Sequence, residues 1–280
     1  MKTQEKIAEA VDQVPALDKR GTFTGPAWDE IIPALDAVLA AGKDGVVAVV
    51  AMLKDVDDGA DYKARYFLHV LAQYLGRPGK EAPRALFVDA LATQLGGERP
   101  KGVQGYVARQ LQVIGSKECA AALGKLLADP ELCDTAAQAL LAIRAGAVEE
   151  FRKALPDLKG GPRLTVLQAL GVLADAASVD AMKSALADAD REMCLAGGWG
   201  LARIGDAASL DSILKAADVE ARYERIKATS SALLLAETLL AAGKKADAAK
   251  IYTHLKATRS DPSELYVAEI ASDALTSLNR

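Results

Sequence analysis

The side chains best suited to acid–base or metal chemistry are scarce and isolated in this sequence. Histidine titrates near neutral pH and is the commonest metal ligand, but the chain has only two. His69 is followed by Val70 and His254 by Leu255, and neither has a companion at the spacing of a metal site. Serine, cysteine and carboxylate nucleophiles therefore lack a histidine base to activate them. We expect a protein that is not an enzyme, has no metal site and needs no cofactor.

A glycine cluster, Gly197-Gly198-Trp199-Gly200, superficially resembles a phosphate-binding loop. It lacks the Lys-Ser/Thr pair that such a loop uses, and it lies within a helical pattern of apolar residues. Gly197 and Gly200 fall on the core positions of that pattern, which favours tight packing against a neighbouring helix. Gly198 is predicted to point outward, where this explanation does not apply.

The helix that holds this cluster belongs to a repeat. Its last apolar residue, Ile204, is matched by Leu173, Ile143 and Ile114, at intervals of 31, 30 and 29 residues. A fixed period near 30 residues indicates stacked copies of one supersecondary unit. The expected second helices of these units are 61–75, a helix ending at 114, 130–143, 162–173 and 191–204, and the first helices begin near residues 44, 81, 117, 148, 179 and 210. No strand is predicted.

The second helix ends in Arg203-Ile204-Gly205-Asp206, and Val113-Ile114-Gly115 is another instance of this ending. The pattern resembles the short bacterial HEAT repeat over residues 44–217. The resemblance implies an all-α, right-handed α–α superhelix of about seven helix pairs. Residues 1–43 are predicted to be capping helices, at 3–18 and 27–41. Residues 218–280 form divergent helical pairs, continuous with the solenoid, in which 241–252 is weakly similar to a tetratricopeptide repeat.

Proteins that resemble this repeat include scaffolds, enzymes and pigment-handling lyases, and fold alone does not decide between such roles. Deoxyhypusine hydroxylase binds di-iron through repeated His-Glu pairs, which this chain lacks. We therefore expect a non-catalytic scaffold that binds a protein or peptide on its concave face. A small-molecule-handling protein of the bilin-lyase type is the first alternative, and a nucleic-acid binder is the second.

Composition narrows these choices. The net charge is −4, and Lys and Arg are scattered rather than concentrated on one face, which disfavours nucleic-acid binding. Apolar runs such as Val46–Leu53 are too short to span a membrane. Met1–Ala10 is mostly polar and does not resemble a signal peptide. We expect a monomer, cytoplasmic by default, or periplasmic or secreted if a leader has been removed.

The three cysteines are predicted to be free thiols. Cys133 and Cys194 occupy the same repeat position two repeats apart, which places them about 20 Å from each other at a helix spacing of ~10 Å. That distance is too long for a disulfide. Cys119 lies on a helix of the other type.

In repeats of this kind the second helices line the concave face, so their non-core positions are the candidate partner-binding residues: Tyr66, Gln73, Arg109, Gln112, Gln138, Leu164, Gln168, Leu195 and Trp199. Leu164, Leu195 and Trp199 are predicted to form an apolar patch, as exposed Trp and Leu side chains do at binding sites. The alternative is that Trp199 leans sideways onto the adjacent repeat and belongs to the core.

Overall fold

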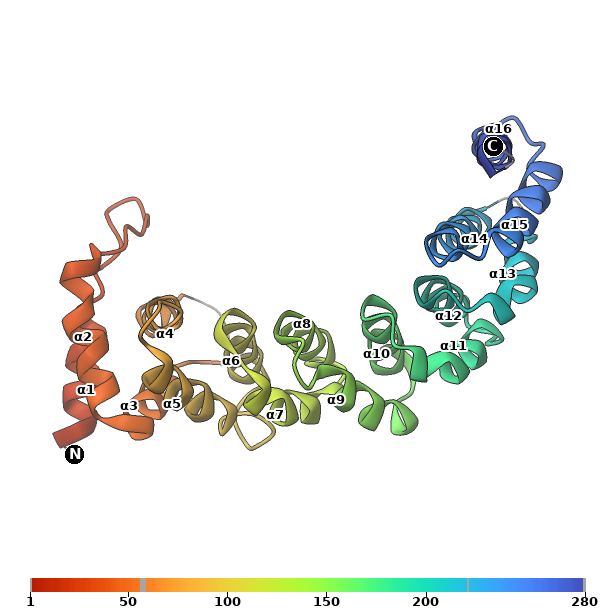
Figure 1. Cartoon of the computed structure of the whole chain (residues 1–280). Helices are drawn as coiled ribbons and strands as arrows, with labels where there is room; N and C mark the ends of the chain where they lie inside the picture. The colour runs from red at the N-terminus through yellow and green to blue at the C-terminus, as the bar shows by residue number, and fades with distance from the viewer. Residues whose placement is uncertain (1, 56–58, 221, 279–280) are drawn as a thin grey trace. The chain divides into compact units, whose positions relative to one another are not determined.

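The computed structural model describes residues 2–55, 59–220 and 222–278 of the chain. Within these residues there are sixteen α-helices and no β-strand, and most consecutive helices are joined by short turns, the longest connection being that between α1 and α2 (Figure 1). The predicted all-α solenoid is therefore confirmed. None of the described helices is long and apolar enough to cross a membrane.

The helices divide between two compact units, Met1–Leu158 and Lys159–Arg280. The first unit contains α1 (Lys2–Asp12), α2 (Trp28–Ala40), α3 (Gly42–Val50), α4 (Tyr62–Leu75), α5 (Glu81–Ala92), α6 (Lys101–Ile114), α7 (Ala120–Gly124), α8 (Cys133–Ile143) and α9 (Ala147–Ala154). The second unit contains α10 (Gly160–Val172), α11 (Val179–Leu186), α12 (Arg191–Ile204), α13 (Leu210–Ala217), α14 (Tyr223–Ala241), α15 (Lys245–Thr258) and α16 (Leu265–Leu278).

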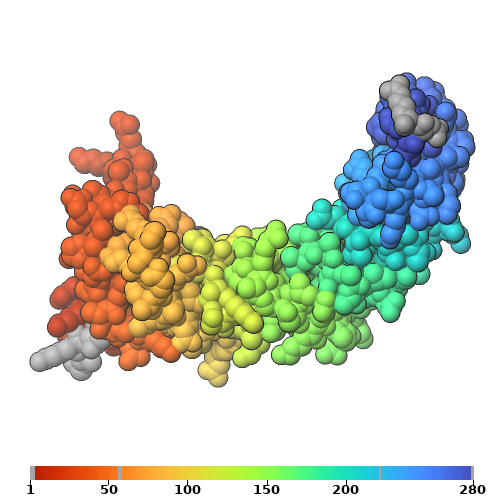
Figure 2. Space-filling view, viewed as in Figure 1, coloured from red at the N-terminus to blue at the C-terminus, as the bar shows by residue number. Residues whose placement is uncertain are grey.

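Each unit has two layers of helices. In the first unit α6 packs against α4 and α8, and these second helices form one layer, while α3 packs on α5 and α7 on α9 in the other layer. In the second unit α12 packs between α10 and α14, and α13 lies between α11 and α15. Side chains fill the space between neighbouring ribbons, so that the stacked helices of each unit form a continuous surface (Figure 2).

The repeat pattern places most helices correctly, and α12 has the predicted bounds. The helix expected at 3–18 is wrong at its end, because α1 stops at Asp12 and Leu17 is exposed. Pro15 follows shortly after, and proline cannot donate the backbone hydrogen bond that would continue a helix. Helix α8 begins at Cys133 instead of 130, because the Asp129 carboxylate accepts the Glu131 amide in a turn at 2.9 Å.

Two of the three glycines inside α12 allow the close packing that the sequence predicts. A Cβ atom on Gly197 would lie 2.6 Å from the carbonyl oxygen of Met182, and one on Gly200 would lie 2.5 Å from the Met182 sulfur. The prediction for Gly198 is wrong, because this residue is buried on the side of α12 that meets Leu186. A Cβ there would meet only the Leu186 Cδ1 atom, at 3.4 Å. Helix α12 ends at Gly205, whose φ of 78° is left-handed.

A fully buried arginine ties α15 to the end of α13. The Arg259 side chain is 0% exposed, and its Nη2 atom donates to the Ala217 carbonyl at 2.8 Å. Its Nη1 atom donates to Asp218 Oδ1 at 3.1 Å, and its Nε atom donates to the Thr229 hydroxyl at 3.2 Å. These partners satisfy a charge that would otherwise be very unfavourable inside the protein. The ring Nε2 of His254 lies 2.9 Å from the other Asp218 oxygen.

Candidate functional site

An open groove of about 420 Å³ lies on the second-helix layer of the second unit. Helices α12 and α14 form its two walls, and the edge of α10 closes one side. Its lining residues are Gln168, Glu192, Leu195, Ala196, Trp199, Tyr223, Lys227, Ser230, Ser231 and Leu234. Three of the predicted site residues, Gln168, Leu195 and Trp199, therefore meet around one cavity.

Trp199 is held in place from both sides. A Cβ atom on Gly171 of α10 would lie 2.7 Å from the Cζ3 atom of the indole, so the ring covers that glycine. The Arg203 guanidinium lies 5.9 Å from the indole centroid and donates from Nη2 to the Val172 carbonyl at 3.0 Å. The indole is half-buried and also lines the groove. Trp199 thus packs on the neighbouring repeat, and part of its ring also lines the groove.

The wall formed by α14 combines apolar, aromatic and hydroxyl groups. Tyr223 is 52% exposed, although aromatic rings gain most by burial. The Ser230 hydroxyl donates to the Ile226 carbonyl at 2.9 Å and the Ser231 hydroxyl to the Lys227 carbonyl at 3.2 Å, bonds that leave the oxygen lone pairs available. The half-buried Leu234 continues this wall.

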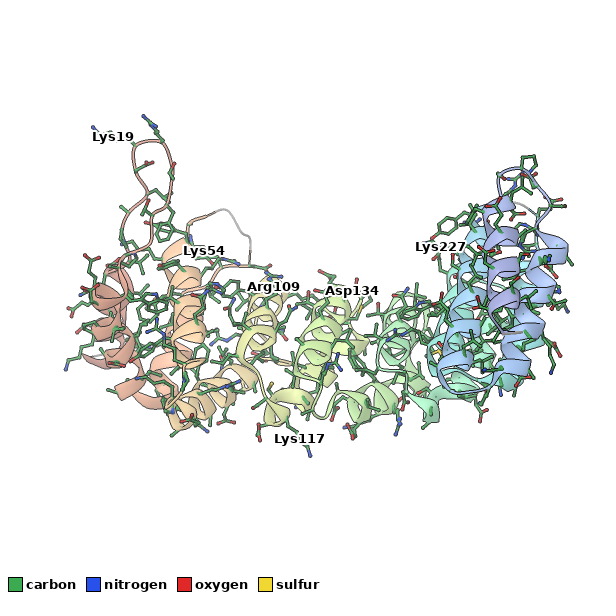
Figure 3. All side chains as sticks on the ribbon, turned by 45° about the horizontal axis from the view of Figure 1, so that its top comes forward. Lys19, Lys54, Arg109, Lys117, Asp134 and Lys227 are labelled. Carbon is green, nitrogen blue, oxygen red and sulfur yellow. The ribbon has the colours of Figure 1, made fainter. Side chains whose placement is uncertain are left out.

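The groove carries one basic and one acidic group without an ion-pair partner among the residues that the structure describes. The Lys227 ammonium lies 5.6 Å from the Tyr223 ring centroid, and Lys227 projects from α14 on the second-helix side (Figure 3). Glu192 is exposed on the opposite wall. Neighbouring charges are already used, since Arg191 of α12 pairs with Glu224 of α14. A ligand in the groove can therefore gain contacts to both free charges without breaking an existing pair.

Behind Leu195 there is a small apolar void between α11, α12, α13 and α14. Gly198 lines it, with Ile213, Ala216 and Ala228. Leu195 and Ser231 line both the void and the groove, so they separate the two spaces. Side chains of α11 and α14 therefore border the space beside Gly198 but do not fill it.

The other predicted site residues do not gather around a comparable cavity. In the first unit Arg109 lies 5.9 Å from the Tyr106 ring centroid and lines a shallow hollow beside α8, on the side where Asp134 also points (Figure 3). Gln73 hydrogen-bonds His69 at 3.0 Å, while Gln112 and Gln138 are exposed. Tyr66 is covered by Phe23 of the segment between α1 and α2. In the second unit Leu164 is half-buried in α10 and does not line the groove.

The residues of α14 were missed by the sequence analysis, although they form a whole wall of the groove. They lie in the divergent part of the chain, where the repeat positions cannot be extrapolated. A signal was nevertheless present, because Tyr223, Lys227, Ser230 and Leu234 are spaced as neighbours on one helical face. An aromatic and a basic residue on the face of the helix opposite its apolar core residues would have predicted a binding surface here.

No protein-family model matches the sequence, and no curated protein matches it. Solved structures do. Kap121p, solved bound to Ste12p, is similar over 89% of this chain, with 12% identity and a TM-score of 0.52, and the likeness spans 34% of that Kap121p chain. This similarity supports the helical-repeat fold alone.

Two further structures are similar at lower TM-scores. An engineered protein matches over 98% of this chain and 78% of its own, with 20% identity and a TM-score of 0.47. A chain of the CpcE–CpcF phycocyanin lyase complex from Nostoc sp. PCC7120 matches over 94% of this chain and 100% of its own, with 16% identity and a TM-score of 0.44.

Proposed function

We propose that this protein is a non-catalytic scaffold that binds an extended peptide segment of a partner protein in the groove between α12 and α14. The observation that carries the proposal is the half-buried Trp199, whose indole is fixed by Gly171 and Arg203 and yet faces an open groove. Tryptophan fixed in this manner is typical of the anchors that dominate binding energy at interfaces.

The chemistry of the groove suits a peptide. Leu195, Ala196 and Leu234 supply apolar surface for its side chains. The amide of Gln168 can both donate to and accept from a peptide backbone, and the serine hydroxyls can accept from it. Lys227 and Glu192 would set the direction of the peptide through its charged groups. Kap121p, which shares the fold, was solved with a protein bound to it, which is consistent with this class of partner.

A peptide-display selection against the full chain tests the proposal directly. Selected peptides should bind the wild-type protein and lose at least tenfold in affinity for Ser230→Arg, which fills the groove from an exposed position. Thr253→Arg on α15 is the matched control, because the Thr253 hydroxyl also caps a carbonyl of its own helix, that of Ala249, at 2.8 Å. It should leave the affinity unchanged.

Fluorescence gives an independent readout of the same binding event. The chain has two tryptophans, so a Trp28→Phe variant leaves Trp199 as the only indole. Binding in the groove should shift the emission of that variant, because the half-buried ring would lose contact with water. Peptides that bind the wild type and Ser230→Arg equally well, with no change in Trp199 emission, would refute the assignment of the groove.

A further inference from the structure

Part of α4 is covered by the segment that joins α1 to α2. This segment, residues 13–27, contains no helix. Phe23 of this segment lies between two tyrosines one helical turn apart. Its ring centroid is 4.6 Å from that of Tyr66 and 6.0 Å from that of Tyr62, edge-on to both. The Tyr62 hydroxyl also donates to the Pro15 carbonyl at 3.2 Å. Tyr62 and Tyr66 thus form an aromatic surface that contacts one aromatic side chain, and Tyr62 also hydrogen-bonds the segment that carries it.

The contact also selects small residues beside the aromatic one. A Cβ atom on Gly25 would overlap the Tyr66 hydroxyl and lie 2.9 Å from the Tyr66 Cζ atom. Any side chain at that position would push the tyrosine away. Thr22 and Thr24, on either side of Phe23, are exposed and add little bulk. The pattern that fits the surface is therefore an aromatic residue in an extended stretch, followed two residues later by glycine.

The segment is held loosely after Val14, which is 1% exposed. No residue from Pro15 to Ala27 is fully buried. The tip forms a turn that supports itself, because the Asp18 carboxylate accepts the amides of Arg20 at 2.8 Å and Thr22 at 2.7 Å. Lys19 projects from this tip into solvent (Figure 3). Segments with few buried contacts open at a small cost in free energy, so the segment can leave α4 while the helices stay folded.

We propose that the Tyr62–Tyr66 surface is a second peptide-docking site, and that residues 15–27 are its resident, displaceable occupant. The external partner that fits is an extended peptide with an aromatic residue flanked by small ones. A tethered occupant has an effective concentration in the millimolar range. The affinity for a free competitor of equal chemistry is therefore reduced in proportion to the fraction of time for which the site is open. This inference takes from the proposed function only the class of ligand, because the surface belongs to the first unit.

The experiment uses the full chain with residues 16–25 replaced by ten Gly and Ser residues. The probe is a fluorescein-labelled synthetic peptide with the sequence of residues 13–27, followed by fluorescence anisotropy. We expect saturable binding to this variant and at least tenfold weaker binding to the wild type, in which the resident segment competes. A Phe23→Ala peptide should lose at least tenfold in affinity, and so should the parent peptide when Tyr66→Ala is added to the variant. Circular dichroism confirms that each variant is folded.

Controls separate this site from the groove. Ser230→Arg, placed in the replaced-segment variant, should leave the anisotropy titration unchanged, so the two proposals can fail independently. Absence of saturable binding at millimolar peptide, or equal binding of the Phe23→Ala peptide, would overturn the proposal.

Discussion

The indole of Trp199 occupies the space that a side chain on Gly171 would need. A Cβ atom built on Gly171 falls 2.7 Å from the Trp199 Cζ3 atom and 3.2 Å from the Cα of Gly200. The missing side chain on α10 therefore allows α12 to approach closely and orients the indole along the wall of the groove. The shape of the candidate site depends on this pair as much as on the residues that a ligand would touch.

Gly171→Ala should destabilise the protein by about 1–3 kcal/mol, because the added methyl group overpacks a tight contact. Trp199→Ala alone should cost about 2 kcal/mol, less than the ~3–5 kcal/mol of a fully buried tryptophan, since the ring is half-buried. The double variant should lose less unfolding free energy than the sum of the losses in the two single variants. Urea unfolding of the four proteins measures the coupling, and strict additivity would show that the two residues do not interact.

Gly198→Ala should stabilise the protein by about 0.5–1 kcal/mol, because alanine is the better helix former and its methyl group has room beside Leu186. The adjacent Gly197→Ala is the matched control and should destabilise it, since its methyl group would strike the backbone of α11. Thermal melts compare the two directly. A loss of stability in Gly198→Ala would mean that the void beside it is not available to a side chain.

All three cysteines should react with a thiol reagent in denaturant without reductant, because all three are free. In the native protein only Cys194, which is half-buried, should react, and slowly. Burial raises the pKa of the Cys194 thiol, and the negative charge of Asp188 raises it further, so little thiolate forms at pH 8. Fast labelling of two or more native thiols would contradict this assignment.

Asp218→Asn should destabilise the protein by about 2 kcal/mol at neutral pH, because the buried Arg259 loses the nearer of its two carboxylate partners and keeps only Glu264, at 3.9 Å. Burial raises the pKa of Asp218, but hydrogen bonds from His254 and Arg259 outweigh it, and the pKa lies below the usual 3.8. A lowered pKa stabilises the folded state above the unfolded value and loses this effect as pH falls through the folded value.

The difference in stability between the wild type and Asp218→Asn should therefore shrink as the pH falls below 3.8. Thermal unfolding of both proteins between pH 3 and pH 7, followed by circular dichroism, checks the direction. A difference that stays constant over this range would show that the carboxylate charge does not contribute.

The 30-residue period was sufficient to predict the helices of both layers and the packing of Gly197 and Gly200, because core positions recur where the same neighbours recur. It failed for Gly198 because α12 is buried on more than one side, against α11 and against α14, whereas a single apolar stripe assumes one buried side. It could not place Tyr66, since the segment that covers it makes contacts some 40 residues away with no periodic signal. Gln168, Leu195 and Trp199 were found, but their partners on α14 lie where the repeat has diverged.

The buried Arg259 also has a consequence for the order in which the chain is made. Its guanidinium binds the Ala217 carbonyl, a partner 42 residues earlier in the sequence. Domains form as units while the chain leaves the ribosome from its N-terminus. Until α15 and Arg259 have emerged, the Ala217 carbonyl lacks the Arg259 guanidinium, and the Asp218 carboxylate lacks both His254 and Arg259. The last repeats therefore complete their contacts together, once α15 has been synthesised, and not one repeat at a time.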